Sequence, residues 1–274
     1  MYRFLLTRQW VILTLVGLVL IPTMVRLGFW QLHRHEHRVA QNQLIGDNLK
    51  ARAVPVTSLT SPGRTVPRED TWRTVRATGT YDTAHEVVVR QRTGSDEQSI
   101  GYFVLTPLTL PGNKAVLVNR GWIPAGTDLT RYPKVPAAPS GEVTVTGRLK
   151  ADETTAVSGI KDKRGLPARQ VSLINSERQA EKLPRPVLGG YVELTAFSVK
   201  GTKGSAKGGK QPEPVAAPDH SSIGPHMAYA IQWWLFAAGV PVGWFVLVRR
   251  ERKDRAAETA PATQEKVPAA AGAE

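Results

Sequence analysis

The sequence predicts an α+β membrane protein in which two transmembrane helices flank an antiparallel, β-rich extracytoplasmic domain of barrel or sandwich type. Three observations support this prediction: two long segments with almost no charge near the chain ends, a basic cluster after the second, and short alternating segments between them. The 274 residues are 41% hydrophobic and carry a formal charge of +13. Because such averages also describe a soluble basic protein, the distribution along the chain decides the fold class.

The first apolar segment begins after Arg8 and extends to Trp30, with Arg26 as its one interruption. As a helix, the 21 residues at 10–30 would measure about 31 Å, which matches a hydrocarbon core of about 30 Å. Arg26 either extends towards the lipid headgroups or pairs with another protein group. No Ala-x-Ala site follows the segment, so we expect an uncleaved anchor rather than a signal peptide.

A second uncharged segment, again of 21 residues, covers residues 228–248. Both segments carry aromatic residues towards their ends, as transmembrane helices do at the membrane interfaces. Residues 249–255 then hold five basic groups, which predicts that the C-terminal segment 249–274 is cytoplasmic. Two spans place residues 1–9 on the same side and residues 31–227 outside. Since no transit peptide rich in Arg and Ser is present, we expect the bacterial plasma membrane.

The location of the charges also changes what they indicate. Of the formal +13, residues 1–30 carry +3 and residues 249–274 carry +1, which leaves +9 for the region between. A domain outside the membrane does not meet chromosomal DNA, so lipid headgroups, acidic partners and carboxylate ligands replace nucleic acid as the expected partners. The chain has no cysteine, which excludes disulfides, thiolate metal sites and cysteine nucleophiles.

Between the spans, the first helix is expected to continue to about Leu49, and β-branched alternation begins at Trp72. A short helix is expected over residues 175–183, capped by Ser176 with Gln179. A Gly/Lys/Pro-rich flexible linker at 199–225 and a disordered tail from about Ala256 complete the organisation. Strands are expected at 72–80, 86–91, 102–109, 114–122, 142–149, 168–173 and 190–197.

Few residue patterns suggest chemistry. The chain has no Gly-x-Ser-x-Gly, His-Glu-x-x-His or Walker-type motif, which argues against an extracytoplasmic hydrolase. The alternating His33, His35 and His37 resemble a metal-binding tract. On a helix, however, His35 points away from the other two and neighbouring arginines oppose a cation, so a solvated interfacial helix is the favoured interpretation.

His226 differs from the other histidines because it stands at the start of the second span. It shares a helix face with Tyr229 and Trp233, and its imidazole can ligate haem iron or hydrogen-bond to lipid headgroups. Gln232 lies inside the apolar segment, where an amide normally needs a protein partner.

Several motifs now agree with one family. In chain order, the sequence resembles the Surfeit locus protein 1 family from about residue 10 to residue 248. The resemblance covers both spans and the strands between them. The matching motifs are Gly28-Phe29-Trp30-Gln31-Leu32-His33-Arg34, Trp72-Arg73-x-Val75-x-Ala77-x-Gly79-x-Tyr81, Gly101-Tyr102-Phe103-Val104-Leu105-Thr106-Pro107, Arg120-Gly121-Trp122-Ile123-Pro124 and His226-x-x-Tyr229-Ala230-x-Gln232-Trp233.

The resemblance implies a membrane assembly factor, not an enzyme, that binds or hands over haem a while the catalytic subunit of haem-copper cytochrome c oxidase matures. The implied partners are that subunit, the haem a synthesis machinery and the lipid membrane. His226 matches the family's proposed haem-ligating histidine, which makes it the expected ligand of the haem iron. A membrane-anchored scaffold that holds oxidase subunits without a cofactor is the alternative.

The expected haem site combines this ligand with an aromatic, amide-lined pocket at the outer leaflet. Arg34 and Arg120 are expected to pair with the haem propionates, because a guanidinium matches a carboxylate with two hydrogen bonds. Tethering of strand ends or binding to lipid phosphates is the alternative for both. Trp122 is expected to shape the rim of the β-domain. The remaining site residues are Trp30, Gln31, Tyr229, Gln232 and Trp233.

Overall fold

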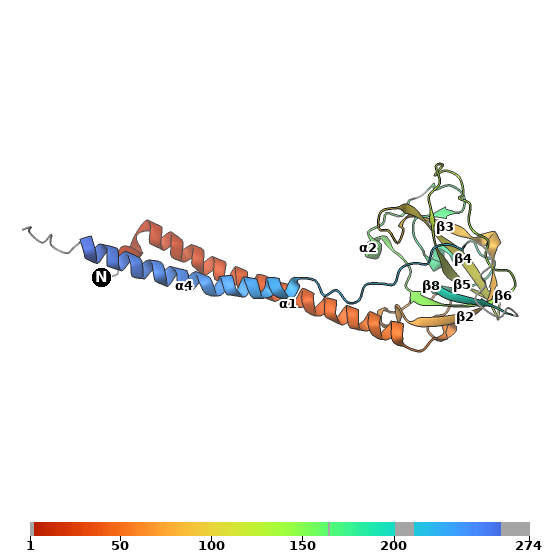
Figure 1. Cartoon of the computed structure of the whole chain (residues 1–274), viewed down its shortest axis with the longest axis horizontal. Coiled ribbons are helices and arrows are strands. Elements are labelled where there is room, and N and C mark those ends of the chain that lie inside the picture. Colours follow the sequence, from red (N-terminus) through yellow and green to blue (C-terminus); the bar gives the residue numbers. More distant parts are fainter. Residues whose placement is uncertain (1–2, 164, 201–210, 259–274) are drawn as a thin grey trace, which may run out of the picture. The chain divides into compact units, whose positions relative to one another are not determined.

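The chain folds into two compact units in a computed structural model that describes residues 3–163, 165–200 and 211–258. The helical unit comprises the described residues up to Val39 and from Ile223 onward, and the β-domain comprises Ala40–Ser222. Figure 1 labels the long helices α1 and α4 of the first unit and the strands of the second. Most of the tail predicted from about Ala256 lies outside the described residues.

The helical unit contains a short 3-10 helix, η1 (Arg3–Leu6), the helix α4 (His226–Glu258) and most of the long helix α1 (Arg8–Lys50), whose last residues from Ala40 belong to the β-domain. The expected continuation of the first helix to about Leu49 is confirmed. Both α1 and α4 are long and apolar enough to cross a membrane, and only 6% and 11% of their most apolar stretches are buried. Such exposure is unlike the core helix of a soluble protein and suits a membrane protein.

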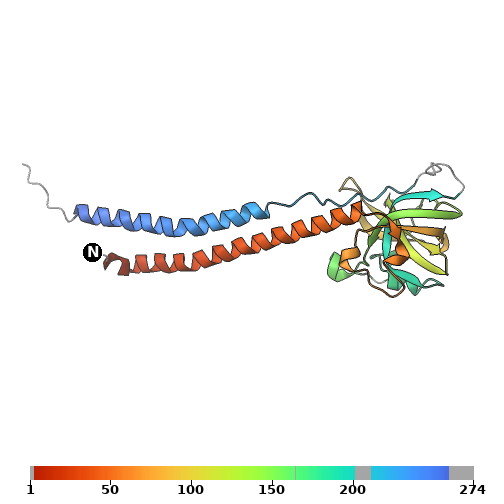
Figure 2. The same ribbon diagram turned by 90° about the horizontal axis from the view of Figure 1, so that it is seen from below.

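The two long helices lie side by side within this unit, as Figures 1 and 2 show. Near the start of α1, the indole N–H of Trp244 donates to Thr14 Oγ1 at 3.1 Å. Trp10 packs edge-on against the same indole, with the ring centroids 6.4 Å apart. Nearer the other end, Phe29 makes an edge contact with Trp234 at 5.6 Å. The pair is therefore held by aromatic packing at two separate places along its length.

The β-domain consists of one eight-stranded sheet in the order β1-β2-β6-β8-β5-β4-β3-β7. All seven expected strands are present, although the segment expected at 168–173 forms only the two-residue β7. The strands are β1 (Val54–Pro55), β2 (Thr74–Tyr81), β3 (Val87–Thr93), β4 (Ile100–Leu110), β5 (Lys114–Pro124), β6 (Glu142–Lys150), β7 (Gln170–Val171) and β8 (Val187–Val199). The short helices between them are η2 (Val56–Ser58), η3 (Arg68–Asp70), η4 (Thr83–His85), α2 (Thr155–Ser158) and α3 (Ser176–Ala180).

An additional pairing of β2 with β4 closes β2, β6, β8, β5 and β4 into a barrel. Alternate residues of β2 point inward, which explains its strict period of two. The barrel interior is filled with valine and leucine, including the fully buried Val75, Leu108 and Val145. Figure 2 shows the strands curving around this core. Of the two expected types, the β-domain is therefore a barrel.

The expectation of an antiparallel domain is wrong in part, because β5 pairs with β8 in parallel. The short strands β1 and β7 also join the sheet in parallel, to β2 and β3. Between β5 and β8 the chain first forms β6 and α3, and this long connection lets β8 return in the direction of β5. Hydrophobic alternation is the same for both directions, so the sequence pattern does not distinguish them.

The capping prediction for the short helix α3 is also wrong. Asn175 caps it, with Oδ1 accepting from the backbone N–H of Arg178 at 3.0 Å. The hydroxyl of Ser176 donates to Asp152 at 2.6 Å instead. Asparagine and serine are about equally good N-caps, so local sequence alone does not choose between adjacent residues.

Part of the predicted linker at 199–225 is held against the β-domain. The backbone N–H and carbonyl of Glu213 pair with those of Trp122 at 2.8 and 2.7 Å. Arg148 donates to the carbonyl of Val215 at 2.8 Å, and Asn42 donates to that of Ser222 at 3.0 Å. Residues 201–210 of the predicted linker lie outside the described residues, and β8 already extends to Val199.

Candidate functional site

His226, the first residue of α4, lies against the amide of Gln31 from α1, with Nδ1 3.0 Å from Oε1. Both side chains are half-buried. When the amide oxygen accepts the bond, Nδ1 carries the proton and Nε2 keeps its lone pair. In metal-ligating histidines generally, a hydrogen bond from the ring nitrogen that does not bind the metal fixes the tautomer. In the neutral form of the ring, this arrangement leaves Nε2 available to a ligand.

Gly28 allows this approach of the two helices. It is buried, and a Cβ atom at its position would overlap the indole of Trp234. Because Gly28 and Gln31 are three residues apart, they lie on one face of α1. Close contact at Gly28 therefore brings Gln31 within reach of His226. This positioning role of Gly28 and Trp234 was not predicted from the sequence, although Gly28 begins the motif that contains Gln31.

Gly224 lies beside the available nitrogen of the imidazole. Its φ of +67° is in the left-handed region that glycine adopts without strain. A Cβ atom there would lie 3.7 Å from Nε2 of His226. A larger side chain would extend over this nitrogen, so glycine leaves it accessible.

Two of the aromatic residues predicted for the site keep large exposed surfaces. Trp30 is 51% and Tyr229 is 47% exposed. The guanidinium of Arg34 lies over the Trp30 ring, 5.2 Å from its centroid. This combines a flat apolar face with a cation that can reach a carboxylate. Arg34 and Trp30 thus lie together on α1, and Tyr229 lies one turn after His226 on α4.

The other two residues predicted on α4 lie further along the helix. Trp233 is half-buried and makes an edge contact with Phe236, with the ring centroids 6.3 Å apart. Gln232 is exposed on the apolar helix, and its amide has no hydrogen bond with another described residue. An amide in this position needs a partner from outside the described chain if the helix is in a bilayer.

Arg120 and Trp122 belong to the β-domain and are buried in it. The Arg120 side chain is 1% exposed, and it donates to Glu86 at 2.9 Å, to the carbonyls of Pro136 and Ala137 at 3.0 Å each, and to Gln211 at 3.2 Å. These partners occupy the guanidinium in this structure, which favours the structural alternative for Arg120; its pairing with a haem propionate stays a prediction.

Trp122 is fixed in the same way. Its indole N–H donates to the carbonyl of Arg92 at 2.8 Å, and its backbone pairs with Glu213. The residue therefore anchors the returning chain to β5, and its expected role in shaping the rim of the β-domain stays a prediction.

Glu86 is the centre of the buried polar network around Arg120. Its carboxylate also accepts hydrogen bonds from the hydroxyls of Thr106 at 2.8 Å and Tyr132 at 3.1 Å. Burial and the Glu86 charge raise the pKa of Tyr132 well above its usual value, so this phenol stays a donor at neutral pH. Sequence reasoning missed Glu86, which precedes β3 with no motif to mark it.

The structure gives no support to a metal tract on α1. His33 and His37 are exposed, and no group of three His, Asp or Glu side chains could hold a metal ion in the described part of the chain. The solvated helix remains the favoured interpretation.

Replacement of Gly28 by alanine is expected to weaken the helix pair by about 1 to 3 kcal/mol, because the added methyl group displaces Trp234 or separates α1 from α4. The His226–Gln31 hydrogen bond should be lost with it. Thermal unfolding in detergent measures the first effect, and the side-chain nitrogen resonances of His226 measure the second. Gly239→Ala in α4 is the control, since nothing lies within 4 Å of its Cβ position. Equal stability of both variants would contradict this role.

Comparisons with known proteins give one consistent result. The sequence model of the SURF1 family matches residues 18–238. Uncharacterised SURF1-like proteins of Mycobacterium bovis and Mycobacterium tuberculosis are each 28% identical over 263 residues, which cover 94% of this chain and 92% of the relative. A SURF1-like protein of Rickettsia bellii is 27% identical over 116 residues, 42% of this chain and 43% of the relative. The residues matched by the SURF1 family model include Gln31 and His226.

Proposed function

Because the chain belongs to the SURF1 family, we propose that it is a membrane assembly factor for haem-copper cytochrome c oxidase. In this role it binds haem a and hands it over during maturation of the catalytic subunit. Its partners are that subunit, the haem a synthesis machinery and the lipid membrane. The haem is cargo, and no catalytic activity is proposed for the chain.

The His226–Gln31 pair carries the proposal. An imidazole whose Nδ1 is held by an amide oxygen 3.0 Å away offers Nε2 as an axial ligand for haem iron. The exposed faces of Trp30 and Tyr229 suit the apolar macrocycle, and Arg34 suits a propionate. Bound haem a supplies a redox-active iron that the oxidase later uses. This chain's residues bind and orient it.

A handover factor must also release its cargo. The site offers one imidazole on an open surface, so few contacts have to break when haem leaves. A closed pocket with two axial ligands would retain haem more tightly. The openness around Trp30 and Tyr229 therefore supports transient binding rather than permanent storage.

We place α1 and α4 across the bacterial plasma membrane with both termini in the cytoplasm and the β-domain outside. The five basic residues in 249–255 support this orientation under the positive-inside rule. His226 then lies at the outer membrane interface, where apolar haem enters from the bilayer and an oxidase subunit approaches from the side.

A scaffold that holds oxidase subunits without binding haem is the second candidate, and the exposed amide of Gln232 favours it. A side-chain amide on an apolar helix surface forms a hydrogen bond with a neighbouring transmembrane helix. The same contact would serve a haem-binding factor, so the two candidates differ only in the cofactor.

Deletion of the gene is expected to lower the haem a absorbance of the bacterial membranes, and the wild-type chain should restore it. A normal oxidase spectrum in the deletion strain would refute both candidates. Purified chain that co-isolates with oxidase subunits, but shows no Soret change on haem titration, would leave the scaffold as the function. The Gln232→Leu variant tests the proposed helix contact in the same co-isolation.

A further inference from the structure

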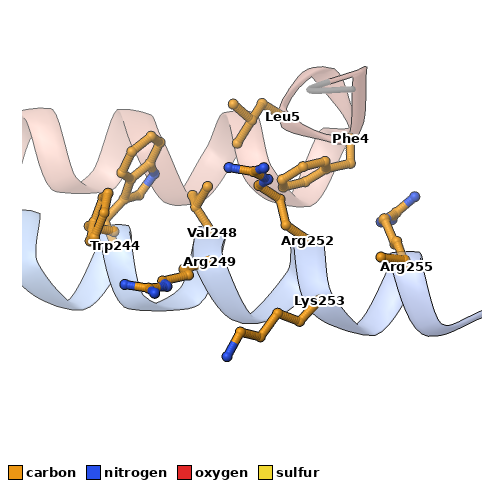
Figure 3. A pocket seen from close by; sticks show the side chains of 10 residues that line it. Phe4, Leu5, Trp244, Val248, Arg249, Arg252, Lys253 and Arg255 are labelled. Carbon is orange, nitrogen blue, oxygen red and sulfur yellow. The ribbon is translucent and has the colours of Figure 1, made fainter.

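A cavity of about 920 Å³ lies in the helical unit, at the end opposite to His226 on α4. The N-terminal residues Phe4 and Leu5 form one side, and the last turns of α4 form the other. Figure 3 shows the side chains of Arg252 and Val248 reaching from α4 towards these residues. Its volume falls in the range of sites that hold small molecules. The site proposed for haem uses none of these residues.

Four basic residues line this cavity: Arg249, Arg252, Lys253 and Arg255. None of its ten lining residues, all in the described part of the chain, is acidic. Of these cations, Arg255 already pairs with Glu251, which accepts from its Nε at 2.8 Å. Asp254, the other acidic residue of the segment, lies 3.9 Å from Arg250, which is outside the cavity lining.

This distribution separates the charges on the helix. Positions 249, 252 and 253 fall on one face because they are three and four residues apart. Arg250, Glu251 and Asp254 line a different, mixed-charge hollow with Trp10. Membrane topology requires only a local excess of basic residues, not their collection on one face. The separation therefore indicates a ligand with negative charge.

The inner part of the cavity is apolar. Phe4 is only 4% exposed, packs edge-on against Trp10 at 5.3 Å and lies 5.3 Å from the guanidinium carbon of Arg255. Val248 and Trp244 continue the apolar lining towards the membrane span, and Trp244 is fixed by Thr14. A ligand for this site must carry an anionic group and hydrocarbon together.

The depth of the cavity matches a lipid headgroup. Val248 is the last residue of the uncharged segment, and Arg252 lies four residues further along the helix. At 1.5 Å per residue this is about 6 Å, and the headgroup layer extends about 5 to 7 Å beyond the hydrocarbon core. The cations thus stand at the level of phosphates.

We propose that this cavity binds an acidic phospholipid, with its phosphate among Arg249, Arg252 and Lys253 and an acyl chain along Leu5 and Val248. The proposal rests on the membrane placement given above and is independent of haem binding. A phospholipid matches both the basic and the apolar residues of the lining, whereas free phosphate would make no apolar contact with Phe4 and Leu5. Nucleic acid likewise leaves the apolar part unexplained.

The test is native mass spectrometry of the full chain, purified in detergent and titrated with phosphatidylglycerol or phosphatidylcholine. One phosphatidylglycerol should bind per chain, in preference to phosphatidylcholine. The variant Arg249→Gln with Arg252→Gln should bind it about thirtyfold more weakly, from two headgroup contacts. Arg8→Gln with Arg250→Gln removes the same charge outside the cavity, and we expect less than a threefold change. Arg249→Lys with Arg252→Lys should retain most of the binding.

The proposal would be overturned if the two double glutamine variants lost equal affinity for phosphatidylglycerol, or if the wild-type chain bound both lipids equally. It would also be overturned if glycerol phosphate bound as tightly as the lipid, or if an oligonucleotide displaced it. A haem titration of the same samples should be unaffected by all three pairs. If the chain binds lipid but not haem, the proposed haem-binding function is wrong and the lipid site stands. If alkaline carbonate extracts the chain from membranes, the membrane placement is wrong.

Discussion

The His226→Ala variant is expected to bind haem at least about 100-fold more weakly than the wild-type chain, with loss of the Soret shift. The imidazole of His226 is the side chain of the candidate site that can ligate iron without first losing a proton, whereas the phenol of Tyr229 must be deprotonated to do so. Loss of a supporting hydrogen bond alone costs about 10- to 100-fold in metal affinity, so loss of the ligand costs more. Gln31→Leu removes that support and should weaken binding by the smaller factor. Haem titration of the purified full chain, followed at the Soret band, measures both.

His33→Ala provides the matched control, because His33 is exposed on α1 two residues from Gln31. Its affinity for haem should stay within about twofold of the wild type. If His226→Ala binds haem like the wild-type chain, His226 is not the ligand and the scaffold becomes the better proposal. If both variants lose affinity equally, the histidines act through the charge or packing of α1 rather than through ligation.

Much of the fold could be predicted from residue patterns. The apolar lengths of α1 and α4 and the period of two in β2 follow directly from burial, which acts residue by residue. The pairing of β2 with β4 and the parallel contact of β5 with β8 could not be predicted in this way. Both depend on which strands meet, and hydrophobic alternation does not specify a partner or a direction.

The candidate site shows the same limit. His226 and Gln31 both lie in motifs, but their 3.0 Å contact depends on the close approach at Gly28, which requires the two helices to be in place. Arg120 shows the opposite outcome. A guanidinium at a strand end looked available for a ligand, but the fold brings Glu86, 34 residues away, into contact with it.

Replacement of Glu86 by glutamine is expected to destabilise the β-domain by about 3 to 5 kcal/mol at neutral pH. The glutamine keeps the shape and can still accept hydrogen bonds, but it leaves the Arg120 charge buried without a counter-ion. Arg169 donates to the backbone carbonyl of Glu86 at 2.8 Å and stacks on Tyr132, and the substitution leaves both contacts in place. The expected loss therefore comes from the Arg120–Glu86 ion pair.

Glu142→Gln is the matched control, because the same chemical change is made in an exposed pair. Glu142 lies 3.0 Å from Lys200, and their side chains are 48% and 75% exposed. Solvent screens this pair, so we expect a loss below about 1 kcal/mol. Denaturant unfolding of the full chain, with hydrogen exchange of β3, β4 and β5 by mass spectrometry, separates the β-domain from the helices. Similar losses in the two variants would mean that the Glu86 charge does not stabilise the barrel, and Arg120 would again be available as a ligand for carboxylates.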